Sequence, residues 1–309
     1  MKSRILITGS SGMLGIDLCQ ELASAYEVDG FDIVNSQQST VHRFYKGDIT
    51  DRDEVVNTVK AVRPEVVIHT AAWADVDGCE GDKEKARKVN TEGSRNIALA
   101  CKDAGAVLIY MSTDFVFDGK KKSPYIESDT THPLGTYAWS KREGEKAIQE
   151  TIDRYFILRT GWLYGRCGKN FVDTIIGKAR TEKVLRVVND QIGSPTYTKD
   201  LAKAIRALLD KISSGLGSRV TGHENDTVGF EIYHVSNSGS VSWYEYAKEI
   251  LRLVGSKTEV VPISSEELAR PARRPAMSVL NTGKFEKYTS CKMRPWRDAL
   301  KEYIKEERK

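Results

Sequence analysis

The sequence predicts an α/β protein built on a doubly wound parallel sheet, with a smaller C-terminal domain. Short apolar runs alternate with longer mixed segments through the first half of the 309 residues. These runs are apolar along their whole length, as in parallel strands that helices cover on both faces. The second half is less regular, and the length exceeds what one simple core needs. We therefore expect a sheet domain over residues 1–160 and a substrate-binding domain over most of residues 161–309.

The expected elements of the first half alternate between strand and helix along the chain. The strands are Arg4–Thr8, Glu27–Asp32, Val66–Thr70, Val107–Ser112 and Tyr155–Thr160. The helices lie near Met13–Ala25, Asp53–Val62, Glu84–Ala104 and Tyr137–Glu150. In the second half, the apolar spacing predicts helices over Asn170–Arg180, Thr198–Leu209 and Ser242–Val254.

Three later segments complete the expected organisation. Ser213–Gly229 is rich in Gly, Ser, Thr and Asn, which predicts a loop. Ile232–Ser236 can return a strand to the main sheet, so the domain boundary near residue 160 is soft. Arg297–Glu307 is amphipathic and highly charged, and its Lys and Glu residues are expected to form a solvated helix face.

Composition and charge exclude several classes of protein. The net charge of +4 comes from 47 basic and 43 acidic residues, a balance that does not indicate nucleic acid as a partner. No apolar run reaches the ~18 residues that span a bilayer, and Ile5–Ile7 is too short for a signal-peptide core. The five cysteines are widely spaced without a C-x-x-C motif, which predicts neither disulfides nor a zinc site. We expect a cytoplasmic protein without a membrane partner.

The first chemical motif is the stretch Gly9-Ser10-Ser11-Gly12-Met13-Leu14-Gly15, between the first expected strand and the first helix. Glycines at such a place allow a tight turn, close approach of a pyrophosphate and close packing of helix on strand. The N-terminus of the helix then offers free N–H groups to the phosphates. The spacing is G-x-x-G-x-x-G, and its position after the first strand predicts a dinucleotide-binding loop.

Acids at two strand ends extend this site. Asp32 ends the second strand, where an acid binds the adenosine ribose and repels the 2′-phosphate that distinguishes NADP from NAD. Arg43 lies downstream and can offset this repulsion, so we expect use of both NADPH and NADH. An acid within Asp48–Asp51 either faces the adenine amino group or caps the helix that begins near Asp53.

The second chemical motif pairs Tyr137 with Lys141. Residues four apart share one face of a helix. A free tyrosine titrates near ~10, and a nearby ammonium favours the phenolate, so we expect Lys141 to lower the pKa of Tyr137. Thr113 ends another expected strand, where its hydroxyl can donate a hydrogen bond to a substrate carbonyl. Together with the glycine loop, these residues predict an acid–base site for hydride transfer.

Further stretches carry a resemblance to a known family. They are Ala71–Trp73 with Val76-Asp77, Ser112–Gly119, Pro124-Tyr125 with Glu127, Gly144-Glu145, Arg159–Trp162, Asn170-Phe171, Asp190–Thr196 and Pro271–Pro275. With the motifs above, the chain resembles the dTDP-4-dehydrorhamnose reductases of the extended short-chain dehydrogenase/reductases. The resemblance implies a Rossmann-type domain and a sugar-nucleotide domain. It also implies reduction of a 4-keto-6-deoxy sugar nucleotide, dTDP-4-dehydrorhamnose in this family, by NADPH or NADH.

The resemblance also implies roles for individual positions. The catalytic set is Thr113, Tyr137 and Lys141. The positions that line the cofactor are Gly9, Gly12, Met13, Leu14, Gly15, Asp32, Asp48, Ile49, Ala72, Trp73, Ala74, Tyr137 and Lys141. The positions that contact the sugar nucleotide are Thr113, Asp114, Trp162 and one or both of Arg273 and Arg274, whose guanidinium fork suits a pyrophosphate. No metal is expected.

Three departures from the family pattern leave the identity of the sugar open. Phe115 replaces tyrosine, Trp73 replaces tyrosine or histidine, and Ala74 replaces threonine. A 4,6-dehydratase is disfavoured because Phe115 has no proton to move. A sugar-nucleotide 4-epimerase stays an alternative, as does a non-catalytic NADP-binding subunit resembling the regulatory subunit of methionine adenosyltransferase. The sequence leaves both a monomer and a homodimer open.

Overall fold

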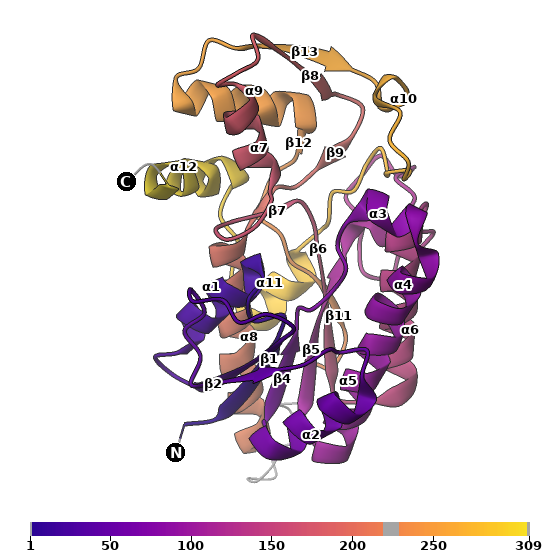
Figure 1. Ribbon diagram of the computed structural model, residues 1–309, viewed down its shortest axis with the longest axis vertical. Helices are drawn as coiled ribbons and strands as arrows, with labels where there is room; N and C mark the ends of the chain where they lie inside the picture. Colours follow the sequence, from indigo (N-terminus) through magenta and orange to yellow (C-terminus); the bar gives the residue numbers. More distant parts are fainter. Residues whose placement is uncertain (1, 219–228, 308–309) are drawn as a thin grey trace.

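Seven parallel strands form the main sheet of the computed structural model, which describes residues 2–218 and 229–307 (Figure 1). In sheet order they are β11 (Ile232–His234), β6 (Tyr155–Thr160), β5 (Val107–Thr113), β4 (Val66–His69), β1 (Arg4–Thr8), β2 (Glu27–Asp32) and β3 (Arg43–Lys46). The strand order reverses between β1 and β4, and ligands bind beyond the carboxyl ends of the strands at such a point. The predicted doubly wound sheet is therefore confirmed.

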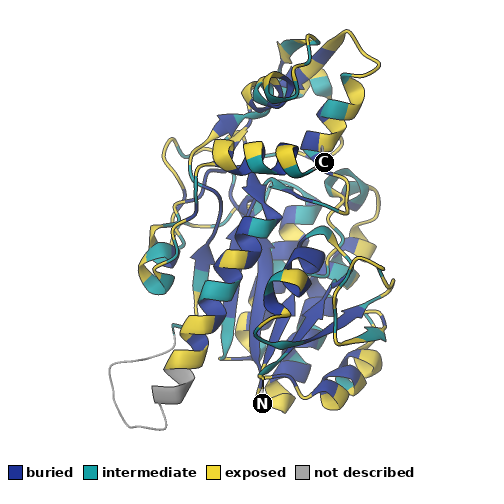
Figure 2. Ribbon diagram, turned by 90° about the vertical axis from the view of Figure 1, so that its left-hand side faces the viewer, coloured by how far each residue is buried: buried dark blue, intermediate teal, exposed yellow. Residues whose placement is uncertain are grey.

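Helices cover both faces of this sheet. Successive strand residues point to opposite sides, so apolar strands present an apolar surface on each face. Ile5 and Ile7 pack with α1 (Met13–Leu22), α8 (Thr198–Ser218) and α11 (Gly283–Thr289). Leu6 packs on the other side with α2 (Arg52–Val62), α5 (Gly93–Ala104) and α6 (Thr136–Thr151). Figure 2 shows the sheet as a buried layer between helices whose outer faces are exposed.

Two helical predictions need correction. The segment expected as one helix over Glu84–Ala104 consists of α4 (Lys83–Arg87), the π-helix η1 (Lys88–Glu92) and α5, with α3 (Val76–Gly81) before them. A π-turn inside a helix is common at functional sites. Helix α8 continues to Ser218, where a loop is expected, because Ile212 extends its buried apolar face. Residues 219–228 of that expected loop lie outside the described residues.

A smaller lobe lies above the carboxyl ends of the strands in Figure 1. Its elements are β7 (Leu163–Tyr164), α7 (Phe171–Lys178), β8 (Val184–Val188), β9 (Ile192–Gly193), β10 (Thr196–Tyr197), β12 (Val241–Ser242), α9 (Trp243–Val254), β13 (Glu259–Ile263), α10 (Ser265–Leu268) and α12 (Trp296–Glu307). They enclose a separate apolar core. Since α8, β11 and α11 pack with the main sheet, the second half of the chain contributes to both lobes.

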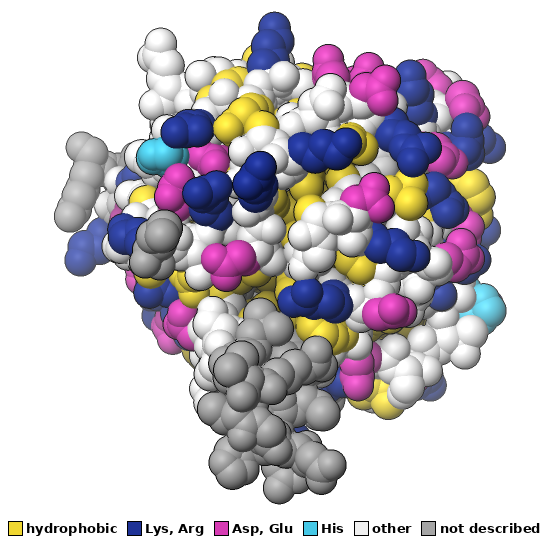
Figure 3. All heavy atoms as spheres, turned by 90° about the horizontal axis from the view of Figure 1, so that it is seen from below, with side chains coloured by type: hydrophobic (Ala, Val, Ile, Leu, Met, Phe, Trp, Pro, Cys, Tyr) yellow, Lys and Arg dark blue, Asp and Glu magenta, His cyan; other side chains and the backbone are white. Residues whose placement is uncertain are grey.

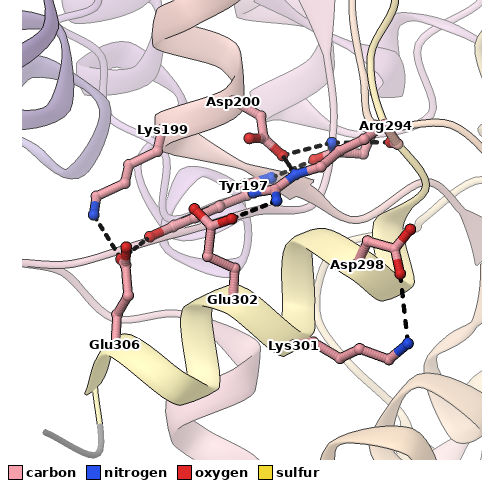
Figure 4. A network of polar contacts seen from close by, with 9 residues as sticks. Tyr197, Lys199, Asp200, Arg294, Asp298, Lys301, Glu302 and Glu306 are labelled. Atoms are coloured by element: carbon pink, nitrogen blue, oxygen red, sulfur yellow. Dashed lines mark hydrogen bonds and ion pairs between the residues drawn. The ribbon is translucent and has the colours of Figure 1, made fainter.

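Two glutamates of α12 bind groups outside the helix, while Lys301 and Lys305 are exposed (Figure 4). Glu306 accepts a hydrogen bond from the Tyr197 hydroxyl at 2.9 Å and pairs with Lys199 at 2.6 Å. Glu302 pairs with Arg294 at 2.5 Å. The expected solvated face therefore holds for the two lysines, whereas Glu302 and Glu306 are only partly exposed and are paired with groups outside the helix.

The face of the molecule seen from below does not carry charges of one sign only. Acidic and basic side chains are interspersed there (Figure 3). Among residues 2–218 and 229–307, no helix has both the length and the apolar character needed to cross a membrane.

Candidate functional site

The glycine motif forms the turn from β1 into α1. Gly9 has a φ of 71°, and a Cβ there would lie 2.7 Å from a backbone nitrogen in the loop after β4. A Cβ at Gly15 would lie 2.1 Å from the Gly9 carbonyl oxygen, so only glycine lets α1 approach this closely. Gly12 is the N-cap and no side chain caps the first turn, which Met13 and Leu14 begin. This cradle fits the pyrophosphate of a dinucleotide.

Asp32 lies at the end of β2, beside the glycine loop. Its Oδ2 accepts a hydrogen bond from the Ser11 N–H at 3.0 Å, and its Oδ1 accepts one from the Val34 N–H at 3.3 Å. The basic residue opposite Asp32 on β3 is Lys46, whereas Arg43 begins that strand three residues earlier. The offsetting role expected of Arg43 stays a prediction, and Lys46 is a second basic residue that lies beside Asp32.

Replacing Asp32 with alanine should shift cofactor preference toward NADPH. At the place expected for the adenosine ribose, the carboxylate would repel a 2′-phosphate and accept a hydrogen bond from a free ribose hydroxyl, so its loss should favour NADPH over NADH. A hydrogen bond to a charged group of ~1.5 kcal/mol predicts a change of about tenfold in the ratio of the two kcat/KM values. Asp32→Asn keeps an acceptor for the Ser11 N–H and separates loss of charge from loss of loop structure. An unchanged ratio in both variants would exclude Asp32 from cofactor selection.

Two acids follow β3, and the roles expected there are to cap α2 or to face adenine. Asp51 is the N-cap of α2, because its side chain accepts hydrogen bonds from two N–H groups of the first turn. Asp48 is exposed and accepts a hydrogen bond from the Thr50 N–H at 2.8 Å. Ile49 is buried. Asp48 therefore does not cap α2 and stays the candidate that faces adenine.

The loop after β4 is clasped by a buried asparagine that the sequence did not single out. Ala72 and Ala74 are exposed, and Trp73 between them is half-buried. The Trp73 N–H donates to Asn90 Oδ1 at 2.8 Å, and Asn90 Nδ2 donates to the Trp73 carbonyl at 3.1 Å. Asn90 Nδ2 also donates to Ser140 Oγ at 3.0 Å. Asn90 lies in η1, so the π-helix links the expected cofactor loop to α6.

Thr113 and Tyr137 come together where β5 ends and α6 begins. The Thr113 hydroxyl lies close enough to the Tyr137 hydroxyl to act on its pKa. Thr113 Oγ1 also donates to Asp114 Oδ1 at 3.2 Å and accepts from the Phe115 N–H at 3.2 Å. Burial raises the pKa of Tyr137 above its ordinary value, and the interaction with Thr113 opposes this rise. Tyr137 is therefore protonated at neutral pH and able to act as an acid.

Lys141 lies one helical turn after Tyr137 and is buried. Its Nζ donates to the Met111 carbonyl at 2.7 Å and lies 4.1 Å from the centre of the Tyr110 ring. Burial lowers the pKa of Lys141 to about 7, and the charge of Glu145 opposes this fall. The expectation that Lys141 lowers the pKa of Tyr137 is wrong in this structure, because burial of the phenol dominates and the ammonium binds Met111.

Asp114 is buried directly after Thr113. Burial raises the pKa of the Asp114 carboxyl to about 7, while hydrogen bonds with Ser278 and Thr113 oppose the rise. Its Oδ2 has no hydrogen-bond partner among the described residues. A Cβ at Gly161 would lie 2.4 Å from the carboxyl carbon, so the absence of a side chain there makes room for this group. A buried oxygen with spare capacity fits a sugar hydroxyl.

Trp162 lies where β6 ends and is held in an unusual conformation. Its φ is 51°, and its ring stacks on Trp243 with centroids 3.4 Å apart and planes 2° apart. A Cβ at Gly193 would lie 2.3 Å from Trp162 Cε2. The stack joins the sheet to the first residue of α9, and Gly193 supplies the space for it. Both rings are half-buried, so one part of the pair remains accessible.

Gly193→Ala should weaken binding of the sugar nucleotide by displacing the Trp162 ring. Aromatic contacts are worth ~0.5–1.5 kcal/mol, which predicts a rise of roughly 2–10-fold in the KM of the sugar nucleotide. Gly177→Ala is a matched control in the same lobe, because nothing lies within 4 Å of a Cβ there. Steady-state kinetics and NADPH titration measure both variants. An equal rise in KM in the control would show that displacement of the Trp162 ring does not cause the effect.

The two arginines between prolines have different surroundings. Arg274 NH1 donates to Asp77 Oδ1 at 2.7 Å and to the Ala272 carbonyl at 2.6 Å. Arg270 also pairs with Asp77, at 3.0 Å. The hydrogen bond from Arg274 is the main reason that the pKa of Asp77 falls to about 2. Arg273 is exposed. Arg274 thus links the segment to α3, and Arg273 is the better candidate for a phosphate.

One group outside this site brings possible metal ligands together within the described residues. Ligand atoms of Glu27, Asp29 and His42 lie within 4.8 Å of one another. They gather around the amino-terminal half of β2, whereas Asp32 lies at its other end. The Arg4 guanidinium is 3.8 Å from Glu27 and competes with a cation. We assign no metal to this group.

The residues that sequence reasoning missed make contacts between distant segments. Asn90 contacts a residue 17 positions earlier, and Trp243 stacks on a residue 81 positions earlier. A single asparagine or tryptophan inside a helix is common, so no local sequence pattern indicates that Asn90 or Trp243 belongs to the site. Lys46 could have been found, because parallel register places the last residue of β3 beside the end of β2.

Comparisons with known proteins match this chain over nearly its whole length. The family model described as the RmlD substrate binding domain matches residues 2–309. The chain is 38% identical over 304 residues to the spore coat polysaccharide biosynthesis protein SpsK of Bacillus subtilis, with 98% of each chain covered. It is 39% identical over 305 residues to a dTDP-4-dehydrorhamnose reductase of Streptomyces griseus, with 97% of this chain and 93% of the other covered. A dTDP-4-dehydrorhamnose reductase of Bacillus anthracis, solved in complex with NADP, has a TM-score of 0.87 and 36% identity, and the match covers 99% of this chain and 100% of the other.

Proposed function

Because the chain belongs to the RmlD substrate binding domain family, we propose that it is an NADP-dependent reductase that converts dTDP-4-dehydrorhamnose to dTDP-rhamnose. The observation that carries this proposal is the meeting of the Thr113 and Tyr137 hydroxyls, with Lys141 one turn away. They lie at the carboxyl end of β5, on the same edge of the sheet as the glycine cradle.

The residues of this chain divide the reduction of a ketone between them. Bound NADPH supplies a hydride to the carbonyl carbon of the sugar. The Tyr137 hydroxyl gives its proton to the carbonyl oxygen, and general acid catalysis of this kind contributes ~10²–10⁴-fold. The Thr113 hydroxyl orients the same oxygen by a hydrogen bond. The Lys141 ammonium, one helical turn from the acid, holds the nicotinamide ribose.

The substrate groups have separate places in this proposal. Asp114 binds a sugar hydroxyl, Trp162 contacts the sugar, and Arg273 binds the pyrophosphate. Residues 161–309 mainly form the sugar-nucleotide site, with α8, β11 and α11 returning to the sheet. We place the enzyme in the cytoplasm, where reduced cysteines are the rule, since Cys19, Cys79, Cys101 and Cys291 are thiols in this structure. The working unit is a monomer or a homodimer.

Turnover of enzymatically made dTDP-4-keto-6-deoxy-L-mannose tests the function. Loss of NADPH absorbance should accompany formation of dTDP-rhamnose, and NADH should be tested in parallel. A 4-epimerase would change the sugar without net use of NADPH, and a regulatory subunit would bind NADP without turnover. A protein that binds NADPH but consumes none with this substrate would overturn the proposal.

A further inference from the structure

Glu145 is a buried carboxylate that the reaction described above does not use. It lies in α6 and is 0% exposed. Its Oε1 accepts hydrogen bonds from Ser112 Oγ at 2.6 Å and Arg159 Nε at 2.9 Å, and its Oε2 accepts one from Arg159 NH2 at 2.8 Å. The Arg142 guanidinium is 3.6 Å from Oε2. A buried ion pair is not stabilising simply because it is paired, so its retention here has to be explained by what it holds in place.

The groups that Glu145 binds adjoin the reacting residues. Ser112 immediately precedes the threonine that ends β5, and Arg159 is the penultimate residue of β6. Glu145 follows Lys141 by four residues and Tyr137 by eight, so all three share one face of α6. The carboxylate therefore connects the helix that carries the acid to the two strand ends beside it.

Close contact of α6 with its neighbours depends on the residue before Glu145. A Cβ at Gly144 would lie 2.6 Å from the Asn90 carbonyl oxygen and 2.6 Å from the Tyr110 hydroxyl. The helix therefore approaches η1 and β5 more closely than any other residue would allow. Gly144 brings α6 to this distance, and Glu145 makes polar contacts that can set its register.

We propose that Glu145 is a positioning residue that sets the register of α6 against β5 and β6 and provides the counter-charge for the Lys141 ammonium. The inference rests on the proposed reductase function. Among the described groups that act on Lys141, Glu145 supplies the negative charge. Tyr110 and Tyr137 are protonated, and burial lowers the pKa of His69 to about 3, which leaves this histidine neutral. Arg142 and Arg159 are the other charged groups beside Glu145, and both pair with its carboxylate.

Glu145→Gln tests the charge, because it keeps the size of the side chain. An opposite charge nearby shifts a pKa by ~1–3 units, so without it Lys141 should lose its proton at a lower pH. The alkaline limb of the kcat/KM profile should move down by about one pH unit. NADPH binding, followed by fluorescence without the sugar, should weaken over the same pH range. Glu145→Asp keeps the charge but shortens the side chain, so kcat should fall several-fold while the limb stays near that of the wild type.

The control is Glu143→Gln on the same helix, where the carboxylate pairs with Lys146 at a half-exposed position. It should keep the wild-type profile. If Glu145→Gln folds and retains the wild-type pH limb of NADPH binding, the inference is wrong even if the enzyme is a reductase. If wild type consumes no NADPH, the proposed function fails, whereas NADPH binding still decides the role of Glu145. If Glu145→Gln does not fold, Ser112→Ala tests the positioning role instead. A lower kcat with an unchanged alkaline limb of the kcat/KM profile would support that role. An unchanged kcat would overturn it.

Discussion

Tyr137→Phe is expected to lower kcat by about 10²–10⁴-fold, because the variant keeps the ring but has no proton to give to the carbonyl oxygen. Burial raises the pKa of Tyr137, so the wild-type hydroxyl is protonated over the whole neutral range. The dissociation constant of NADPH should stay near that of the wild type, since Lys141 and the glycine cradle are unchanged. Single-turnover measurements of NADPH oxidation report the chemical step directly.

Tyr155→Phe serves as the matched control for this prediction. Tyr155 begins β6 at the opposite end of the strand from the site, and its hydroxyl is 3.4 Å from Gln149 Nε2. Its loss should leave kcat unchanged. If Tyr137→Phe retained activity within a few-fold of the wild type, Tyr137 would not be the acid, and another proton donor in the site would have to replace it.

Arg273→Ala is expected to raise the KM of the sugar nucleotide by roughly 10–150-fold, the effect of losing a charged hydrogen bond of ~1.5–3 kcal/mol. In the proposed function the glycine cradle holds the cofactor, so the pyrophosphate of the sugar nucleotide needs a separate cation. Arg273 lies in a segment that prolines stiffen, and its exposed side chain is available to the substrate. The NADPH dissociation constant should not change.

Neighbouring arginines provide the contrast for this measurement. Arg270→Ala removes an exposed partner of Asp77 and should leave the KM near that of the wild type. Arg274→Ala breaks the contact of its segment with α3, so it should lower the melting temperature more than the other two variants. If Arg274→Ala raised the KM while Arg273→Ala did not, the assignment of the two arginines would be reversed. Weaker NADPH binding in both would place the segment at the cofactor site.

Local patterns in the sequence were enough to predict the framework of the sheet and the cofactor loop. Strands β1, β2 and β6 have the expected bounds, because apolar runs bounded by turn residues carry their own structural information. The roles of Gly9 and Gly15 follow in the same way, since a turn into a helix constrains residues that are close in the chain. The tyrosine and lysine were predictable for the same reason, because their spacing of four belongs to one helix.

Tertiary structure decided the environment of these residues, because burial and partners depend on segments that are distant in sequence. Arg274 is paired with Asp77 across 197 positions, a contact that no local pattern encodes. The Lys141 ammonium binds a carbonyl on β5, and burial raises the pKa of Tyr137 although the sequence predicts the opposite. The sequence by itself therefore determined which groups are present and on which elements they lie. Only packing determined their desolvation and their partners, since the cost of removing a charge from water depends on everything that surrounds it.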